Sequence, residues 1–154
     1  MLVESLKTIF KRDLLKVRLE IESYKNEKMI WHIEKGIANS AGNLCLHLVG
    51  NLNAYIGVGI GKTGYVRKRD LEFSSKDIPQ TTLLKMVDDT LTMLDSSLDK
   101  LSDEQLHDIF PIKIWEHETE MGYTLIHLAA HLNYHLGQIN YHRRLLDNEL
   151  LPLL

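Results

Sequence analysis

Apolar residues recur every three or four positions along most of this chain of 154 residues, and this spacing restricts the fold more than any other feature. At the N-terminal end they form one continuous stripe, which consists of Leu2, Leu6, Ile9, Phe10, Leu14, Val17, Ile21 and Tyr24. A stripe of this kind is typical of an amphipathic helix with one buried face. The chain contains only three prolines, so most of it is free to be helical.

The second expected helix runs from about Ser40 to Ile56, and the pair Asn39-Ser40 offers its N-cap. It is apolar on more than one side, so we expect it to be buried. Glycines at positions 57, 59, 61 and 64 are expected to end it. The segment GKTGYVRKRD that follows is a predicted loop whose basic residues are Lys62, Arg67, Lys68 and Arg69.

Two further long helices are predicted in the second half of the chain. Pro79 suits the first turn of a helix near Gln80 to Lys100, whose inner face would carry Leu83, Leu84, Val87, Leu91, Leu94 and Leu98. The last helix is expected from about Tyr123 to Leu146. A short helical turn closed by Pro111 and an acidic connection separate the two, and residues 150–154 form a tail.

Four long amphipathic helices with little strand signal predict an all-α fold, a four-helix bundle of the up-down type. Trp31 and Ile33 would anchor the connection between the first two helices to the core. The length suits one domain over residues 1–154 with a single sizeable core.

Composition excludes several classes of protein. A net charge of -3 argues against a nucleic-acid-binding protein, which usually has a strong basic excess. The chain has no run of about 18 or more uncharged apolar residues, so no membrane span is expected, and no signal peptide is expected at its charged N-terminus. Cys45 is the only cysteine, which excludes an intrachain disulfide, fits the cytoplasm, and suits a buried core position better than a nucleophile.

Three histidines recur every four residues on the expected last helix, in HLAAHLNYHLGQINYHRR at 127–144. Four residues of an α-helix advance about 400°, so neighbours in such a series differ by about 40° and roughly 6 Å of rise. His131 and His135 can therefore face one ion from the same helix. His127 lies about 80° around the axis from His135, too far to share that ion comfortably.

A further ligand must come from another helix, and His47 is the best candidate. It stands in the apolar run LCLHLVGNL, where an unpaired imidazole costs about 1–3 kcal/mol. A metal ion shared with the last helix would satisfy it. A histidine on an apolar helix is more often a hydrogen-bonded core or rim residue, and a His-x-x-x-His pair alone is weak evidence for a metal, so the spacing leaves both interpretations open.

The remaining histidines have simpler explanations. His32 follows Trp31 in a connection, where packing or solvent is expected ahead of a role as a substitute ligand. His107 and His117 lie in polar surroundings and are assigned to the surface. His142 is expected to act as a cation near the end of the last helix, where it would complement the negative end of the helix dipole.

At residues 131–138, HLNYHLGQ, the sequence resembles the DinB/YfiT-like superfamily of four-helix-bundle proteins, which has a His-x-x-x-His-x-Gly-Gln signature on its last bundle helix. The superfamily adds one histidine from the second helix, in a phrase similar to NSAGNLCLHLVGNL at 39–52. The resemblance covers nearly the whole chain, including the long connection between the second and third helices. It implies that the ligands of a divalent metal, zinc or nickel first, are His47, His131 and His135.

The resemblance also suggests roles for neighbouring residues. His127 would pack beside the site or make one hydrogen bond to it. Gly137 would allow another helix to approach closely, and Gln138 would orient a ligand or line the pocket, with a capped surface amide as the alternative. The superfamily commonly pairs through bundle faces, so a homodimer is expected.

Three neutral imidazoles leave a coordination position open, which is typical of a catalytic site. Zinc there would lower the pKa of water toward about 7 or hold a thiolate, and the donor set alone does not choose between zinc, nickel, iron and manganese. Characterised relatives are thiol-dependent transferases and isomerases, and others have been proposed as hydrolases. The resemblance thus implies a metal-dependent enzyme, a thiol transferase or hydrolase, acting on a small molecule.

Two alternatives stay open beside the enzyme: a stress-related bundle whose metal stabilises the fold or a dimer, and a metal-free bundle. The sequence shows no general base, since no acidic residue lies between His131 and His135. Asn51, one turn after His47, could supply hydrogen bonds, and so could Asn133 or Tyr134. The basic loop could bind a carboxylate or phosphate of a thiol cofactor through Arg67 and Arg69, with a solvated loop as the alternative.

Overall fold

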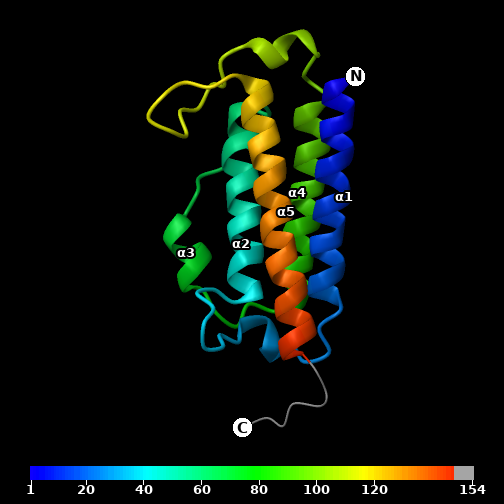
Figure 1. Ribbon diagram of the computed structural model, residues 1–154, viewed down its shortest axis with the longest axis vertical. Coiled ribbons are helices and arrows are strands. Elements are labelled where there is room, and N and C mark those ends of the chain that lie inside the picture. Colours follow the sequence, from blue (N-terminus) through cyan, green and yellow to red (C-terminus); the bar gives the residue numbers. More distant parts are fainter. Residues whose placement is uncertain (148–154) are drawn as a thin grey trace.

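A computed structural model describes residues 1–147, and four long helices run side by side within that range (Figure 1). They are α1 (Leu2–Glu22), α2 (Ala41–Leu52), α4 (Gln80–Leu98) and α5 (Met121–Leu146). Shorter elements join them: the 3-10 helices η1 (Glu27–Trp31) and η3 (Glu104–His107), the π-helix η2 (Asn53–Val58) and the α-helix α3 (Arg69–Ser74). Residues 1–147 contain no β-strand, which confirms the predicted all-α bundle; the tail at 150–154 lies outside the described residues.

The directions of the helices depart from strict up-down alternation at one connection. The α1 helix runs antiparallel to α4, and the side-chain amide at the start of α4, Gln80 Nε2, donates to the carbonyl of Ile21 at 2.8 Å. Figure 1 shows α2 and α4 running in the same direction. The crossover, residues 59–79, returns along the bundle before α4 begins, and it carries α3 on the outside of α2 (Figure 1).

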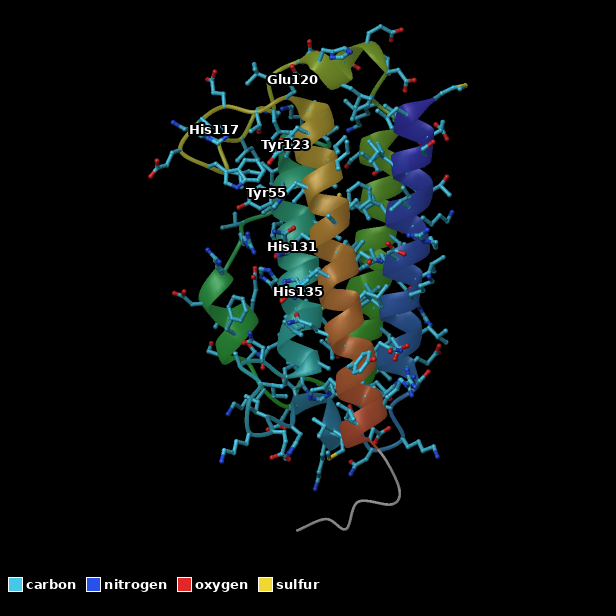
Figure 2. All side chains as sticks on the ribbon, in the orientation of Figure 1. Tyr55, His117, Glu120, Tyr123, His131 and His135 are labelled. Atoms are coloured by element: carbon cyan, nitrogen blue, oxygen red, sulfur yellow. The ribbon has the colours of Figure 1, made fainter. Side chains whose placement is uncertain are left out.

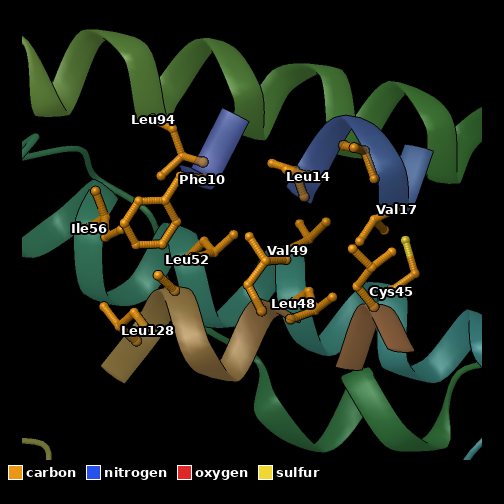
Figure 3. Close-up of a cluster of buried hydrophobic side chains, with 14 of the residues drawn as sticks. Phe10, Leu14, Val17, Cys45, Leu48, Val49, Leu52, Ile56, Leu94 and Leu128 are labelled. Carbon is orange, nitrogen blue, oxygen red and sulfur yellow. The ribbon is translucent and has the colours of Figure 1, made fainter. Parts of the chain in front are cut away.

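One continuous core joins the four long helices. Figure 3 shows its centre, where side chains from every long helix meet; among them are Phe10, Leu14, Leu48, Leu52, Leu94 and Leu128. Burial of one such leucine contributes about 1.5–3 kcal/mol. The stripe predicted for α1 is present, with Val3 buried in place of the exposed Leu2.

Two predicted features of α2 meet different outcomes. Ser40 is the N-cap, and its Oγ accepts a hydrogen bond from the backbone N–H of Asn43 at 3.1 Å. The helical path continues through η2, so the prediction that glycines end the helix is wrong for Gly57 and Gly59. Gly57 permits a close approach of α4, because a Cβ there would lie 3.2 Å from Sδ of Met93.

The structure confirms that Trp31 anchors the connection to the core and that Cys45 is a buried core residue. The same anchoring role predicted for Ile33 is wrong. The indole of Trp31 is buried against Gly42, where a Cβ would lie 2.7 Å from the ring. Ile33 is 47% exposed and anchors nothing. Cys45 is fully buried, and burial raises the pKa of its thiol to about 12, so it is a core residue and not a nucleophile.

None of the helices in residues 1–147 combines the length and the apolar character needed to cross a membrane.

Candidate metal centre

The antiparallel packing of α2 against α5 brings the three predicted ligands together. His131 and His135 leave successive turns of α5 (Figure 2), and His47 reaches them from α2. The ring centroid of His47 lies 5.1 Å from that of His131 and 5.2 Å from that of His135. Nε2 of His131 lies 3.2 Å from Nε2 of His47 and 3.1 Å from Nε2 of His135.

These distances match the requirements of a shared ion. Nitrogens that each lie about 2.0–2.1 Å from zinc, in tetrahedral geometry, are separated by about 3.4 Å. The nitrogens here are only slightly closer, and the three ligand atoms all lie within 4.8 Å of one another. The separations are therefore close to those of imidazole nitrogens that share one ion.

Hydrogen bonds on the outer nitrogens set the tautomers of two ligands. Nδ1 of His47 lies 3.0 Å from Oε2 of Glu72, and a carboxylate only accepts, so this nitrogen carries the proton. Nδ1 of His135 likewise donates to Oε1 of Gln138 at 2.7 Å, a contact of the kind predicted for an amide that orients a ligand. In both rings the lone pair of Nε2 therefore points to the centre of the cluster.

His131 has no arrangement that satisfies all the polar atoms without an ion. Its Nδ1 is buried and has no hydrogen-bond partner among the described residues. If Nε2 of His131 carried the proton, it could donate to only one of the facing Nε2 lone pairs, that of His47 or that of His135. If Nδ1 carried the proton instead, the Nε2 lone pairs of all three rings would face one another and repel. A cation shared by the three Nε2 atoms removes the opposition of their lone pairs, so the residues present fit a divalent metal.

The surroundings also favour the neutral, ligating form of the imidazoles. His47 is only 7% exposed, and burial lowers its pKa even though Glu72 acts in the opposite direction. Burial, followed by the neighbouring rings of His135 and His47, lowers the pKa of His131 to about 4. Metal binding requires deprotonated nitrogen, so at neutral pH both side chains are ready to bind.

The family model described as DUF1572, a protein of unknown function, matches residues 2–153. The chain belongs to the DUF1572 family. Comparison with curated proteins gave no match, and comparison with solved structures gave none either. The family description assigns no activity to the DUF1572 protein.

Glu72 is the residue of the site that sequence reasoning missed. It lies on α3, its side chain is 6% exposed, and it accepts a hydrogen bond from His47. Arg67 donates to both of its oxygens, from Nε to Oε1 at 2.7 Å and from Nη2 to Oε2 at 2.9 Å. The one sequence signal was Gly50, a glycine inside an apolar helix three residues after His47, which indicates a close approach.

The two arginines predicted to bind a cofactor differ in position. Arg67 is occupied by Glu72, and its guanidinium also lies over the ring of Tyr55, 5.6 Å from the centroid. Arg69 is exposed at the start of α3, and its role in the DUF1572 protein stays a prediction.

The other pocket candidates surround the cluster unequally. His127 is exposed; its ring stacks on that of His131 at 6.4 Å and meets Trp115 edge-on at 4.8 Å, without a hydrogen bond to residues 1–147. Asn51 is buried beside His47, and its Oδ1 has no partner in the described part of the chain. Asn133 faces away, donating to Asp13 of α1 at 3.1 Å.

Two predictions made for α5 are wrong. His142 is buried and not a surface cation: its Nδ1 lies 2.6 Å from the hydroxyl of Tyr24, and its Nε2 donates to the carbonyl of His32 at 2.8 Å. Burial lowers its pKa, so it is neutral. Gly137 permits no close approach, because a Cβ there would have no atom of residues 1–147 within 4 Å.

The surface assignments of His107 and His117 are confirmed, and His32, for which packing or solvent was expected, is exposed as well.

Proposed function

We propose that this DUF1572 protein binds one divalent metal ion through the Nε2 atoms of His47, His131 and His135, and that the ion is the centre of an enzyme. The convergence of three Nε2 atoms, two of them with lone pairs fixed by Glu72 and Gln138, is the observation that carries the proposal. Zinc or nickel is the first candidate, since both accept imidazole nitrogen.

The reaction we propose is thiol transfer to a small molecule, or hydrolysis of one. Three protein ligands leave a position open, and a divalent ion there supplies Lewis acidity that lowers the pKa of water or a thiol toward neutrality. His131 and His135 are only partly buried, which gives a small molecule access to that side of the cluster. Asn51, whose amide oxygen has no partner within residues 1–147, would hydrogen-bond a ligand beside His47.

We also propose that the DUF1572 chain is a member of the DinB/YfiT-like superfamily. The helical bundle and the signature from His131 to Gln138 support this, and so does the meeting of that signature with His47. Both the thiol chemistry and the low-molecular-weight thiol cofactor depend on this membership.

A second function is supported by the fact that the proposed ligands come from two different helices. Because His47 belongs to α2 and the other two belong to α5, an ion would cross-link two helices. A non-enzymatic, stress-related bundle could use its metal for that purpose alone. In that case most of the binding energy belongs to folding, and the metal-free chain would be largely unfolded.

Elemental analysis of the untagged protein tests the site itself. We expect one equivalent of zinc or nickel in the wild type and less than a tenth of that in His135→Ala. His127→Ala is the matched control, because this exposed histidine lies on the same helix and is no ligand, so it keeps the metal. A wild type that takes up no divalent ion after incubation with zinc and with nickel would disprove the proposal.

Turnover separates the enzyme from the structural alternative. The metal-loaded protein is assayed with thiols plus epoxide or alkyl electrophiles, and with amide and ester substrates. The enzyme proposal expects turnover that His135→Ala abolishes while its circular dichroism stays that of a folded bundle. A metal-loaded protein inert across the panel, together with an unfolded metal-free form, would favour the alternative.

We further propose a homodimer located in the cytoplasm. Exposed Leu15 and Leu19 on α1 support a pairing face, whereas the leucines of α4 at 84 and 91 are partly buried and offer less. The buried free thiol of Cys45 fits a reducing compartment. Light scattering that shows a monomer at working concentration would contradict the dimer.

A further inference from the structure

The crossover is attached to the metal centre through a buried carboxylate. Glu72 is 6% exposed, which is unusual for a glutamate and requires compensating partners. Arg67 supplies a bidentate ion pair from within the crossover, and Nδ1–H of His47 supplies a hydrogen bond from α2. These two groups hold the carboxylate in place and direct it at one ligand of the proposed site.

The backbone of α2 leaves space for this carboxylate at one position. A Cβ at Gly50 would lie 2.0 Å from Oε1 of Glu72, a distance that no side chain tolerates. Glycine inside a helix is less favourable than alanine, so the glycine at this position is explained by the carboxylate that it accommodates. The carboxylate thus enters α2 where a side chain is missing, one turn from His47.

The backbone of α3 is held to α2 as well. The side-chain amide of Asn43 donates to the carbonyls of Glu72 and Ser75, at 3.0 and 2.9 Å. The ring of Phe73 lies 5.1 Å from that of His47. Movement of α3 would therefore displace the partner of Nδ1 and one neighbour of the imidazole ring together.

We propose that Glu72 is a positioning residue for the metal centre and that it links the ion to α3. It holds His47 in the tautomer with Nε2 free, fixes the ring orientation and makes Nε2 a stronger donor to a cation. This inference rests on the proposed metal site. Metal binding should in turn tighten the hydrogen bond to Glu72 and protect the amides of α3, because the coupling is reciprocal.

Zinc affinity, measured by competition with a chromogenic chelator, tests the role of the carboxylate. Glu72→Gln keeps the shape and loses the charge, and we expect it to weaken zinc binding by about 10- to 100-fold. Gly50→Ala should weaken binding in the same direction by displacing Glu72, although no ligand is changed. Gly137→Ala is the matched control: the same substitution on a helix that carries two ligands, facing open space, and it should keep the wild-type affinity.

Hydrogen–deuterium exchange of the wild type gives a second readout that needs no variant. We expect zinc to slow exchange in residues 69–74, and to do so much less in Glu72→Gln. If Glu72→Gln does not fold, Gly50→Ala and the exchange data on the wild type decide the question.

The outcomes separate the two proposals. A wild type that binds no zinc ends the metal site and this inference together. A wild type that binds zinc, with Glu72→Gln and Gly50→Ala binding equally well, overturns the positioning role alone. Exchange in α3 that zinc leaves unchanged in the wild type would overturn the link between the ion and the crossover.

Discussion

His47, His127 and His142 show how one residue type acquires three roles from its surroundings. The imidazole of His47 has a carboxylate on one nitrogen and the imidazole of His131 on the other, so it is a candidate metal ligand. His142 has a phenol hydroxyl and a backbone carbonyl as partners, so it is a satisfied neutral core residue. His127 is exposed, and its contacts with the described residues are ring contacts alone. Partners on both nitrogens, and not helix position, decide each role.

Gln138→Leu should weaken metal binding while leaving the fold intact. The substitution removes the acceptor that holds Nδ1–H of His135, and loss of such a partner costs about 10- to 100-fold in affinity. Gln138 is exposed, so the melting temperature of the metal-free protein should stay close to that of the wild type. Calorimetric zinc titration measures the change, with exposed Tyr134→Phe as control. Equal affinities would show that the amide does not orient the ligand.

Because of His142, the free energy of unfolding should decrease as the pH falls. Its pKa in the folded protein lies below the ordinary value of 6.5, so the unfolded chain takes up the proton first as the pH falls. The contribution is therefore complete above pH 6.5 and is lost below it, by up to about 1.4 kcal/mol per pH unit. In urea unfolding of metal-free protein between pH 7.5 and 5.5, His142→Gln should lose less stability than the wild type. Identical losses would contradict a neutral buried imidazole.

At the scale of helices, replacing glycine by alanine should have opposite effects on stability at two positions. Gly42→Ala places a Cβ against the buried ring of Trp31 and should destabilise the docking of η1 on α2, by about 1–3 kcal/mol. Gly137→Ala meets open space on α5 and should stabilise the protein by about 0.5–1 kcal/mol. Chemical denaturation of both variants measures the two signs. Stabilisation by Gly42→Ala would mean that Trp31 packs elsewhere.

Helix positions could be predicted from the sequence because periodicity and caps are local properties. The start of α2 at Ser40 followed from its capping hydroxyl, and His47 was found because a polar residue in an apolar run needs a partner. The continuation past Gly57 depends on packing against α4, which propensity does not record. The parallel course of α2 and α4 depends on the path of a loop. Glu72 lies on a six-residue helix too short for any periodic signal.

At the scale of the whole molecule, polar contacts close both ends of the bundle, while the candidate metal centre lies along its side. Backbone amides of Leu2 and Val3 donate to Asp103 at one end, each at 3.0 Å. At the other end Asp147 accepts from the amides of Lys25 and Asn26, at 2.6 and 3.1 Å. The core and these end contacts do not depend on an ion, so the metal-free chain should still fold.

Metal removal should therefore lower the melting temperature by a limited amount. An ion that binds only the folded state stabilises it by about 2.7 kcal/mol at a free concentration one hundred times its Kd. For a chain of this size each kcal/mol corresponds to about 2–4 °C, so saturating zinc should raise the melting temperature by about 5–10 °C over chelator-treated protein. His127→Ala should show the same rise, and His47→Ala, which removes the ligand from α2, should show almost none. Complete unfolding on chelation would instead favour the structural alternative, because the ion would then supply the folding energy that the core and end contacts are expected to provide. If the melting temperature of the wild type is the same with and without zinc, the result would contradict binding of the ion to the folded protein.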